Sequence, residues 1–231
     1  MIKKRIYDPE VEEVASIFPR LDISDVPTAR ATLETFIEDM AKQGVERPTD
    51  DRIEEIERMI PGPGGAPDVR IRIYMPKDRT GAGPGFVNFH GGGFVLGDLE
   101  SEHPRCLIMA AQGGAVSIGV DYRLAPENPF PAGVEDCYAA LQWVVEHAQE
   151  LKIDPARIAI GGCSAGGNLT AAVALMARDR GGPRAALQML FYPVIDDRCD
   201  TRAMLDGAGL YIWQYQNSLD MWEHYIGQDR S

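Results

Sequence analysis

Short β-rich runs alternate with helical stretches along most of this sequence, and the alternation restricts the fold more than any other feature. Helical patterns lie between the runs, at about 103–112, 132–149 and 165–180. Strands connected by helices pair mostly in parallel, with helices on both faces of the sheet, so the predicted fold class is α/β. The alternation around Ile71 in the first run predicts a strand with one wet face. The five runs are "VRIRIYMP" (69–76), "GFVNFH" (85–90), "AVSIGVDY" (115–122), "RIAIGG" (157–162) and "LQMLFYP" (187–193).

The two ends of the chain lack the strand pattern and are predicted to be helical. Over residues 8–45 we expect helix, with Pro27 in a first turn and Gly44 as the stop. Leu33 and Met40 lie on the apolar face of this pattern. Near the other end, "NSLDMWEHYIG" predicts a final amphipathic helix.

The composition limits what the protein can bind. The chain of 231 residues carries a formal net charge of −12, which repels nucleic acid and anionic membrane surfaces. It has neither a secretory signal pattern nor an apolar run approaching the ~18 residues of a membrane span. Its four cysteines show no metal-ligand spacing and are few for a disulfide framework, so we expect a cytoplasmic protein without a bound metal.

The turn after the run at 157–162 has the pattern Gly-x-Ser-x-Gly, which spans residues 162–166 as Gly-Cys-Ser-Ala-Gly. A strand, a sharp glycine turn and a helix are the setting in which a serine side chain is exposed at the end of a strand. The small flanking residues let the backbone reverse tightly, and the helix start offers free N–H groups to developing negative charge. The pattern predicts a nucleophilic Ser164 in a strained backbone conformation.

A second glycine-rich turn supports this prediction. The sequence His90-Gly91-Gly92-Gly93 ends the run at 85–90. A loop of this kind at a strand end can turn backbone N–H groups toward a substrate oxygen that becomes an anion during acyl transfer. Two motifs, each at a strand end and in the expected chain order, make a chance match improbable.

These motifs resemble those of the bacterial hormone-sensitive-lipase-like carboxylesterases of the α/β-hydrolase superfamily. The resemblance implies that Ser164 is the nucleophile and that the N–H groups of Gly92, Gly93 and Ala165 form the oxyanion hole. Gly91 would shape this loop. The likeness covers about residues 50–197 and is carried by "HGGGF" (90–94), "DYRLAPENPFPA" (121–132), "DPARIAIGGCSAGGNL" (154–169) and "YPVIDD" (192–197).

The same resemblance implies roles for other parts of the chain. His90 would support the oxyanion loop and not act as the base. In "DYRLAPE" a structural turn would pair Arg123 with Glu127 and hold the serine turn. The implied architecture is an α/β hydrolase with a helical cap. Its implied division is a cap segment at 1–50, the core at 51–200 and a second cap-like helical segment at 201–231.

The sequence departs from the family pattern immediately before the serine. The family usually has Gly-Asp-Ser-Ala-Gly there, and Cys163 replaces the aspartate. In a turn between strand and helix only the side chain at the apex points outward. We therefore expect Cys163 to be a buried filler and not the nucleophile.

The general base and its orienting acid are the second departure. The family pattern implies an acid roughly 95 residues and a histidine roughly 125 residues beyond Ser164, and the 231-residue chain ends before both. We therefore expect these residues to be the first three-quarters of such an enzyme, without its last strands and with little turnover by themselves. A minor alternative is a triad improvised from Ser164, His224 and Asp196 or Asp197. The remaining histidines, His103 and His147, are expected to be structural.

The motifs and the resemblance thus predict a serine carboxylesterase that acts through an acyl-enzyme, and the resemblance implies short-to-medium acyl esters of small alcohols or phenols as its substrates. The sequence predicts a small-molecule ester as the partner, no cofactor, and neither nucleic acid nor membrane. The oligomeric state stays open, with a homo-oligomer among the alternatives. Two other functions remain open: a non-catalytic binding protein that keeps the pocket and the oxyanion loop, and a hydrolase of amides or formamides.

Overall fold

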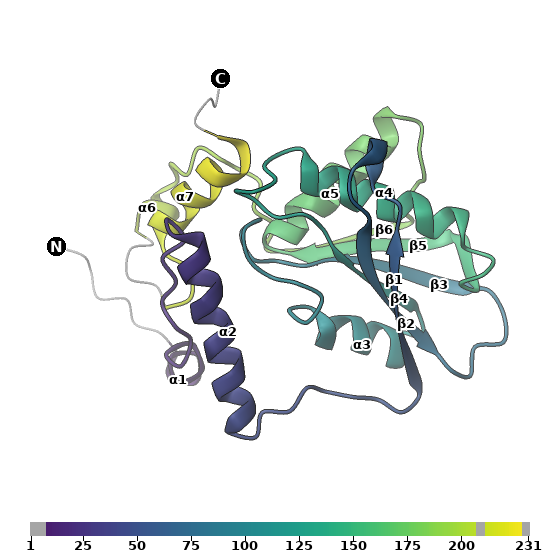
Figure 1. The fold of residues 1–231 in the computed structure, drawn as a ribbon, viewed down its shortest axis with the longest axis horizontal. Coiled ribbons are helices and arrows are strands. Elements are labelled where there is room, and N and C mark those ends of the chain that lie inside the picture. Colours follow the sequence, from purple (N-terminus) through teal and green to yellow (C-terminus); the bar gives the residue numbers. More distant parts are fainter. Residues whose placement is uncertain (1–7, 207–210, 228–231) are drawn as a thin grey trace. The chain divides into compact units, whose positions relative to one another are not determined.

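The computed structural model describes residues 8–206 and 211–227. The chain divides into two compact units (Figure 1). One is Arg47–Ile195, and the other combines the two ends of the chain, Met1–Glu46 and Asp196–Ser231. None of the helices within the described ranges has the length and apolar character that crossing a membrane requires.

The larger unit is built on a six-stranded sheet with the order β1-β2-β4-β3-β5-β6. The pairs β3/β4, β3/β5 and β5/β6 are parallel, whereas β1/β2 and β2/β4 are antiparallel. The five predicted strands are all present, so the predicted mostly parallel α/β sheet is confirmed. The strands are β1 (Ile53–Ile60), β2 (Val69–Pro76), β3 (Gly83–Phe89), β4 (Val116–Asp121), β5 (Ile153–Cys163) and β6 (Leu187–Phe191).

Helices cover both faces of this sheet, as predicted. In Figure 1, α3 lies on one face, and α4 and α5 lie on the other. The buried core includes β-branched and aromatic side chains of β3, β4 and β5. The helices of this unit are α3 (His103–Ala111), α4 (Ala132–Glu146), α5 (Ala165–Asp179) and the short 3₁₀ turn η1 (Pro63–Gly65).

The register of the parallel strands brings three turns together at one edge of the sheet. Phe89 at the end of β3 pairs with Gly162 of β5, and Cys163 at the end of β5 pairs with Phe191 at the end of β6. The residues that follow each strand are therefore neighbours. The sheet places the glycine-rich turn after β3 beside the serine turn after β5.

The prediction that one face of β2 is exposed to water is wrong for Arg72 and Tyr74. Arg72 and Tyr74 are 7% and 0% exposed. The Tyr74 hydroxyl lies 2.9 Å from Nδ1 of His103, because α3 packs on this face. Arg72 lies 2.6 Å from a carboxylate oxygen of Glu57 and 2.6 Å from one of Glu100. Of the polar residues that alternate along β2, Arg72 and Tyr74 are therefore buried with partners, whereas Arg70 at the start of the strand is exposed.

The smaller unit corrects the single helix expected over 8–45. There are two helices, because α1 ends before Ser16 and α2 begins only after Asp25, whose carboxylate accepts the N–H of Thr28 at 3.2 Å. Phe18 precedes a proline, and this position disfavours helical backbone. Pro27 does lie in a first turn, and the predicted final helix is present. The helices are α1 (Pro9–Ala15), α2 (Val26–Lys42), α6 (Arg202–Leu205) and α7 (Tyr215–Ile226).

Candidate active site

Ser164 occupies a strained turn between β5 and α5. Its backbone has φ 53° and ψ −118°, and residues other than glycine rarely adopt a positive φ of this kind. Close packing of the neighbouring chain requires glycine on both sides. A Cβ added to Gly162 or Gly166 would overlap the carbonyl oxygen of Phe89. The predicted strained turn at the end of a parallel strand is therefore confirmed.

The segment after β6 holds the backbone of Ser164. The Ser164 N–H donates to the carbonyl oxygen of Phe191 at 3.0 Å. The Ser164 carbonyl accepts the N–H of Val194 at 3.2 Å and that of Asn168 at 3.1 Å. Asn168 in turn donates its side-chain amide to the carbonyl oxygen of Val194 at 2.7 Å. Both backbone groups of Ser164 are thus occupied. By contrast, Ala165 is the first residue of α5, so its N–H has no acceptor within the helix.

The glycine-rich turn after β3 passes directly beside Ser164. A Cβ on Gly91 would lie 3.0 Å from the Cys163 sulfur and 3.7 Å from the Ser164 Cβ. Gly92 and Gly93 have φ values of 113° and 60°, and a Cβ on Gly92 would overlap the carbonyl oxygen of Leu96. Only glycine fits this backbone, which brings peptide groups within reach of the serine.

His90 is locked into the framework of this turn. Its ring stacks on Tyr122 with centroids 4.1 Å apart and planes inclined by 12°. Its Nδ1 lies 2.7 Å from the carbonyl oxygen of Gly91, so Nδ1 must carry the proton. The Tyr122 hydroxyl donates to the carbonyl oxygen of His90 at 2.8 Å. Burial lowers the pKa of His90, so the ring is neutral. These contacts agree with a supporting role.

Cys163 lies behind the serine turn. Its thiol donates to Oε1 of Glu102 at 2.8 Å, and Arg105 donates to Oε2 of the same carboxylate at 2.6 Å. Burial is the largest cause that raises the pKa of Cys163, and the hydrogen bond to Glu102 is the second. A thiol held in its protonated form is a weak nucleophile, so the geometry favours Ser164 as the attacking group.

The resemblance implied a pair of Arg123 with Glu127, and the structure shows a pair of Arg123 with Asp136. Its guanidinium forms a two-point ion pair with the fully buried carboxylate of Asp136 on α4, at 2.8 Å and 2.7 Å. The Arg123 N–H donates to the same carboxylate at 3.0 Å. Sequence reasoning missed both Asp136 and Glu102, because each is recognised only through a partner distant in the sequence. No local pattern marks either residue.

The other histidines hold structural contacts within their own units. His103 Nε2 donates to the carbonyl oxygen of Pro48 at 2.7 Å. His147 Nδ1 donates to that of Trp143 at 2.9 Å. His224 Nε2 donates to that of Ile23 at 2.8 Å, within the smaller unit. Of the two acids considered for an improvised triad, Asp196 is bound by Arg198 at 2.9 Å and 2.6 Å. Within Arg47–Ile195 the Ser164 hydroxyl has no hydrogen-bond partner.

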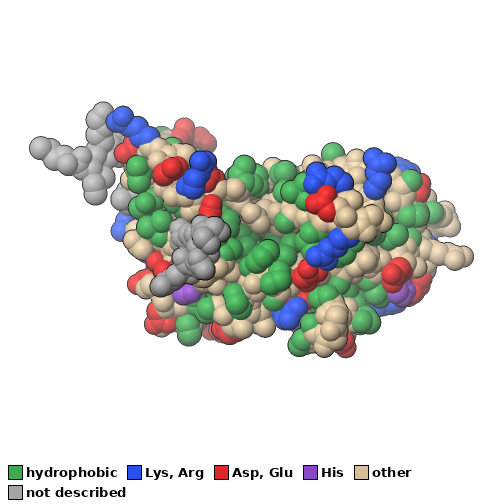
Figure 2. Space-filling view, turned by 90° about the horizontal axis from the view of Figure 1, so that it is seen from above, with side chains coloured by type: hydrophobic (Ala, Val, Ile, Leu, Met, Phe, Trp, Pro, Cys, Tyr) green, Lys and Arg blue, Asp and Glu red, His purple; other side chains and the backbone are tan. Residues whose placement is uncertain are grey.

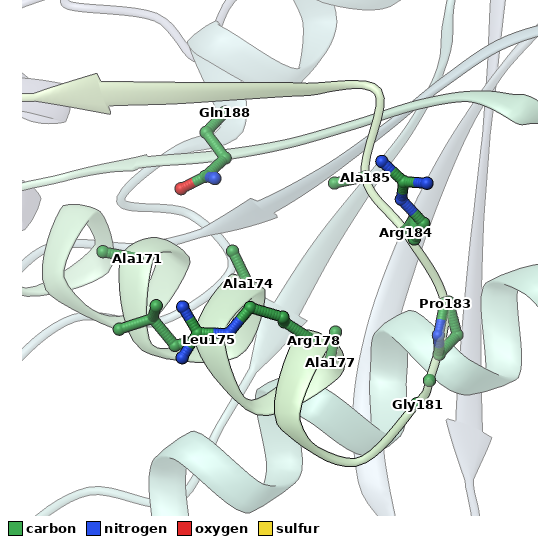
Figure 3. Close-up of a pocket in the computed structure, with 11 residues that line it drawn as sticks. Ala171, Ala174, Leu175, Ala177, Arg178, Gly181, Pro183, Arg184, Ala185 and Gln188 are labelled. Atoms are coloured by element: carbon green, nitrogen blue, oxygen red, sulfur yellow. The ribbon is translucent and has the colours of Figure 1, made fainter.

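Neither a cluster of metal-ligating side chains nor the groove between α5 and β6 accompanies the serine turn in the part of the chain that the structure describes. Across residues 8–206 and 211–227 no three His, Cys, Asp or Glu side chains gather as a metal ion requires. A groove of about 700 Å³ lies between α5 and β6 (Figure 3), and Ser164 is not among the residues that line it. Its walls include Ala171, Ala174 and Leu175 on α5 and Gln188 on β6.

Comparisons with known proteins identify the family and its relatives. A family model described as alpha/beta hydrolase fold matches residues 86–231. Carboxylesterase NlhH of Mycobacterium tuberculosis is 47% identical over 138 residues, which are 60% of this chain and 43% of that protein. Esterase LipI of the same organism is 40% identical over 196 residues, 83% of this chain and 58% of that protein. The chain spans about half the length of these curated relatives.

Solved structures give the same picture. A bacterial heroin esterase superposes with a TM-score of 0.90 at 41% identity, over 97% of this chain and 69% of that one. An esterase from the hyperthermophilic archaeon Pyrobaculum calidifontis superposes with a TM-score of 0.79 at 38% identity, over 94% of this chain and 68% of that one. The fold of the chain is thus similar to that of solved esterases.

Proposed function

The chain belongs to the alpha/beta hydrolase fold family whose model matches residues 86–231, and we propose that it supplies the nucleophile and the oxyanion-binding loop of a serine carboxylesterase. The observation that carries this proposal is the strained left-handed turn at Ser164, with the Gly91 turn beside it. The names of the relatives support ester hydrolysis. Its proposed substrates are short-to-medium acyl esters of small alcohols or phenols.

The proposed reaction has two halves. The Ser164 Oγ attacks the ester carbonyl carbon while a general base accepts its proton. The carbonyl oxygen becomes an anion, which the N–H groups of Gly92, Gly93 and Ala165 bind. The alcohol then leaves with the proton, and the acyl group remains on Ser164. Water attacks this acyl-enzyme by the same route and releases the acid.

The base and its orienting acid are not assigned to residues of this chain. His90 is unsuited because its ring is buried, neutral and committed to the carbonyl oxygen of Gly91. A serine without an adjacent base keeps its proton and attacks esters poorly. We therefore expect low turnover from the 231 residues alone, because the oxyanion loop and substrate binding contribute only part of the rate enhancement.

The proposed setting of the enzyme is the cytoplasm. All four cysteines are buried thiols, which suits a reducing compartment. The net charge of −12 disfavours nucleic acid and anionic membranes as partners. On the face drawn in Figure 2, basic side chains are interspersed with acidic ones and form no continuous basic patch. The proposed partner is thus a small ester, and a homo-oligomer remains an alternative to the monomer.

The proposal is tested by labelling and by turnover. A fluorophosphonate should modify Ser164, located by peptide mass spectrometry, and Ser164→Ala should abolish both this adduct and the hydrolysis of p-nitrophenyl acetate. His224→Ala should leave the labelling rate unchanged. Loss of labelling in both variants would instead establish the improvised triad.

The two alternative functions give different outcomes in the same experiment. A non-catalytic binding protein would bind esters saturably but form no adduct at Ser164. An amide hydrolase would be labelled at Ser164 and would also release p-nitroaniline from an acyl anilide, a bond that an esterase leaves essentially uncleaved. Either result would contradict the esterase proposal.

A further inference from the structure

A continuous set of contacts connects the three turns at the sheet edge through Glu102. The Cys163 sulfur lies between Oε1 of Glu102, at 2.8 Å, and the backbone of Gly91, whose added Cβ would be 3.0 Å away. Arg105 donates to Glu102 at 2.6 Å and stacks its guanidinium over the ring of Phe191, 4.4 Å from the centroid. Gly91 follows β3, Cys163 ends β5 and Phe191 ends β6.

The carboxylate of Glu102 is largely buried and lies next to Cys163, the residue before the nucleophile. Glu102 is 9% exposed, and Arg105 holds one of its oxygens. The other oxygen needs a hydrogen-bond donor, since a buried acceptor without a partner costs free energy. The Cys163 thiol is that donor. An aspartate at this position, the residue typical of the resembling family, would instead place a second carboxylate against the first, and like charges at this distance repel.

We propose that Glu102 is a positioning residue that fixes the spacing between the Ser164 turn and the Gly91 turn through the Cys163 thiol, so that position 163 of this chain must donate a hydrogen bond. The inference rests on the proposed function, because the spacing matters only if an oxyanion forms between the two turns. Loss of the donor would free Cys163 from Glu102 and loosen the contact with Gly91. The Ser164 Oγ and the oxyanion donors would then lose their alignment, and small misplacements slow such reactions strongly.

The test compares matched variants by the rate of Ser164 phosphonylation in the purified chain, resolved into the binding constant of the phosphonate and the maximal labelling rate. Cys163→Ser keeps the donor and should stay within about threefold of the parent rate, whereas Cys163→Ala should label about tenfold more slowly with binding unchanged. Cys163→Asp should be slower still. The double variant Cys163→Asp with Glu102→Gln restores a donor–acceptor pair and should recover most of the loss.

A control and a second measurement separate the possible failures. Glu146→Gln removes the same charge from an exposed position on α4 and should not change the labelling rate. Absence of any adduct in the parent would contradict the proposed function. Burial and the Glu102 carboxylate together raise the pKa of the Cys163 thiol, so Glu102→Gln, which removes the second cause, should also speed alkylation of Cys163 by iodoacetamide. A labelled parent with equal rates for Cys163→Ala and Cys163→Ser, or an unrescued double variant, would overturn the positioning role.

Discussion

At the scale of single residues, His90 should make stability depend on pH. The unfolded imidazole titrates near pH 6.5, whereas burial lowers its pKa in the fold. Below about pH 6.5 the unfolded chain therefore binds more protons, and this contribution to stability is lost as the pH falls, by at most about 1.4 kcal/mol per pH unit. Urea unfolding at several pH values should show a shallower dependence in His90→Asn, whose amide can still donate to Gly91. Parallel curves for parent and variant would contradict the assignment.

Gly166 gives a second prediction at this scale. Alanine normally favours a helix over glycine by about 1 kcal/mol, yet here its Cβ would overlap the carbonyl oxygens of Phe89 and His90. Gly166→Ala should therefore destabilise the fold by about 1–3 kcal/mol. Gly81→Ala, where nothing lies within 4 Å of the added Cβ, should change the free energy of unfolding by less than about 0.5 kcal/mol. Equal unfolding midpoints for the two variants would refute the close approach.

The serine turn was predictable from sequence because its signal is local. The glycines around Ser164 and the run from Gly91 to Gly93 encode their own backbone conformations within a few residues. Cys163 was expected to be buried, but its hydrogen bond to Glu102 was not. That carboxylate lies 61 positions away along the chain, and only the register of β3 and β5 brings the two side chains together.

At the scale of elements, the ion pair of Arg123 with Asp136 joins the turn after β4 to helix α4. Asp136 is fully buried, so removing its charge leaves the guanidinium without its partner. Asp136→Asn should lower the free energy of unfolding by about 3–5 kcal/mol. The neighbouring Glu135 forms a partly exposed pair with Arg180, and Glu135→Gln should cost less than about 1 kcal/mol. Chemical denaturation measures the free energy of unfolding of both variants. Similar losses in Asp136→Asn and Glu135→Gln would contradict the difference expected between a buried and a partly exposed ion pair.

The elements that sequence reasoning missed share a physical cause. The strand β1, "IEEIERMI", carries four charged residues. Two of its glutamates form ion pairs with arginines outside the strand: Glu57 pairs with Arg72, and Glu55 pairs with Arg47. An expectation of one wet face for β2 failed for the same reason. Periodicity reports which residues alternate, but not which partners the rest of the fold will supply for a charged side chain.

At the scale of the whole molecule, the exposed edge strand β6 predicts self-association of the purified chain. Leu187 and Leu190 are 55% and 42% exposed, and β6 is the last strand of the sheet described here. Unpaired strand edges with apolar side chains recruit other chains. In sedimentation velocity, Leu190→Lys should reduce the associated fraction several-fold. Ile108→Lys, on helix α3 and 50% exposed, should not. A parent chain that stays monomeric at high concentration would remove the basis for this expectation.

The backbone hydrogen bonds that hold Ser164 also determine when the site can form during synthesis. Two of the three backbone partners of the serine, Phe191 and Val194, are translated after helix α5, whereas Asn168 belongs to that helix. A nascent chain that has left the ribosome only as far as α5 therefore contains the serine but lacks the partner of its N–H group. The reactive geometry can assemble only once β6 has been released and has paired with β5. The strained form of this serine therefore exists in the cell only after β6 has paired with β5.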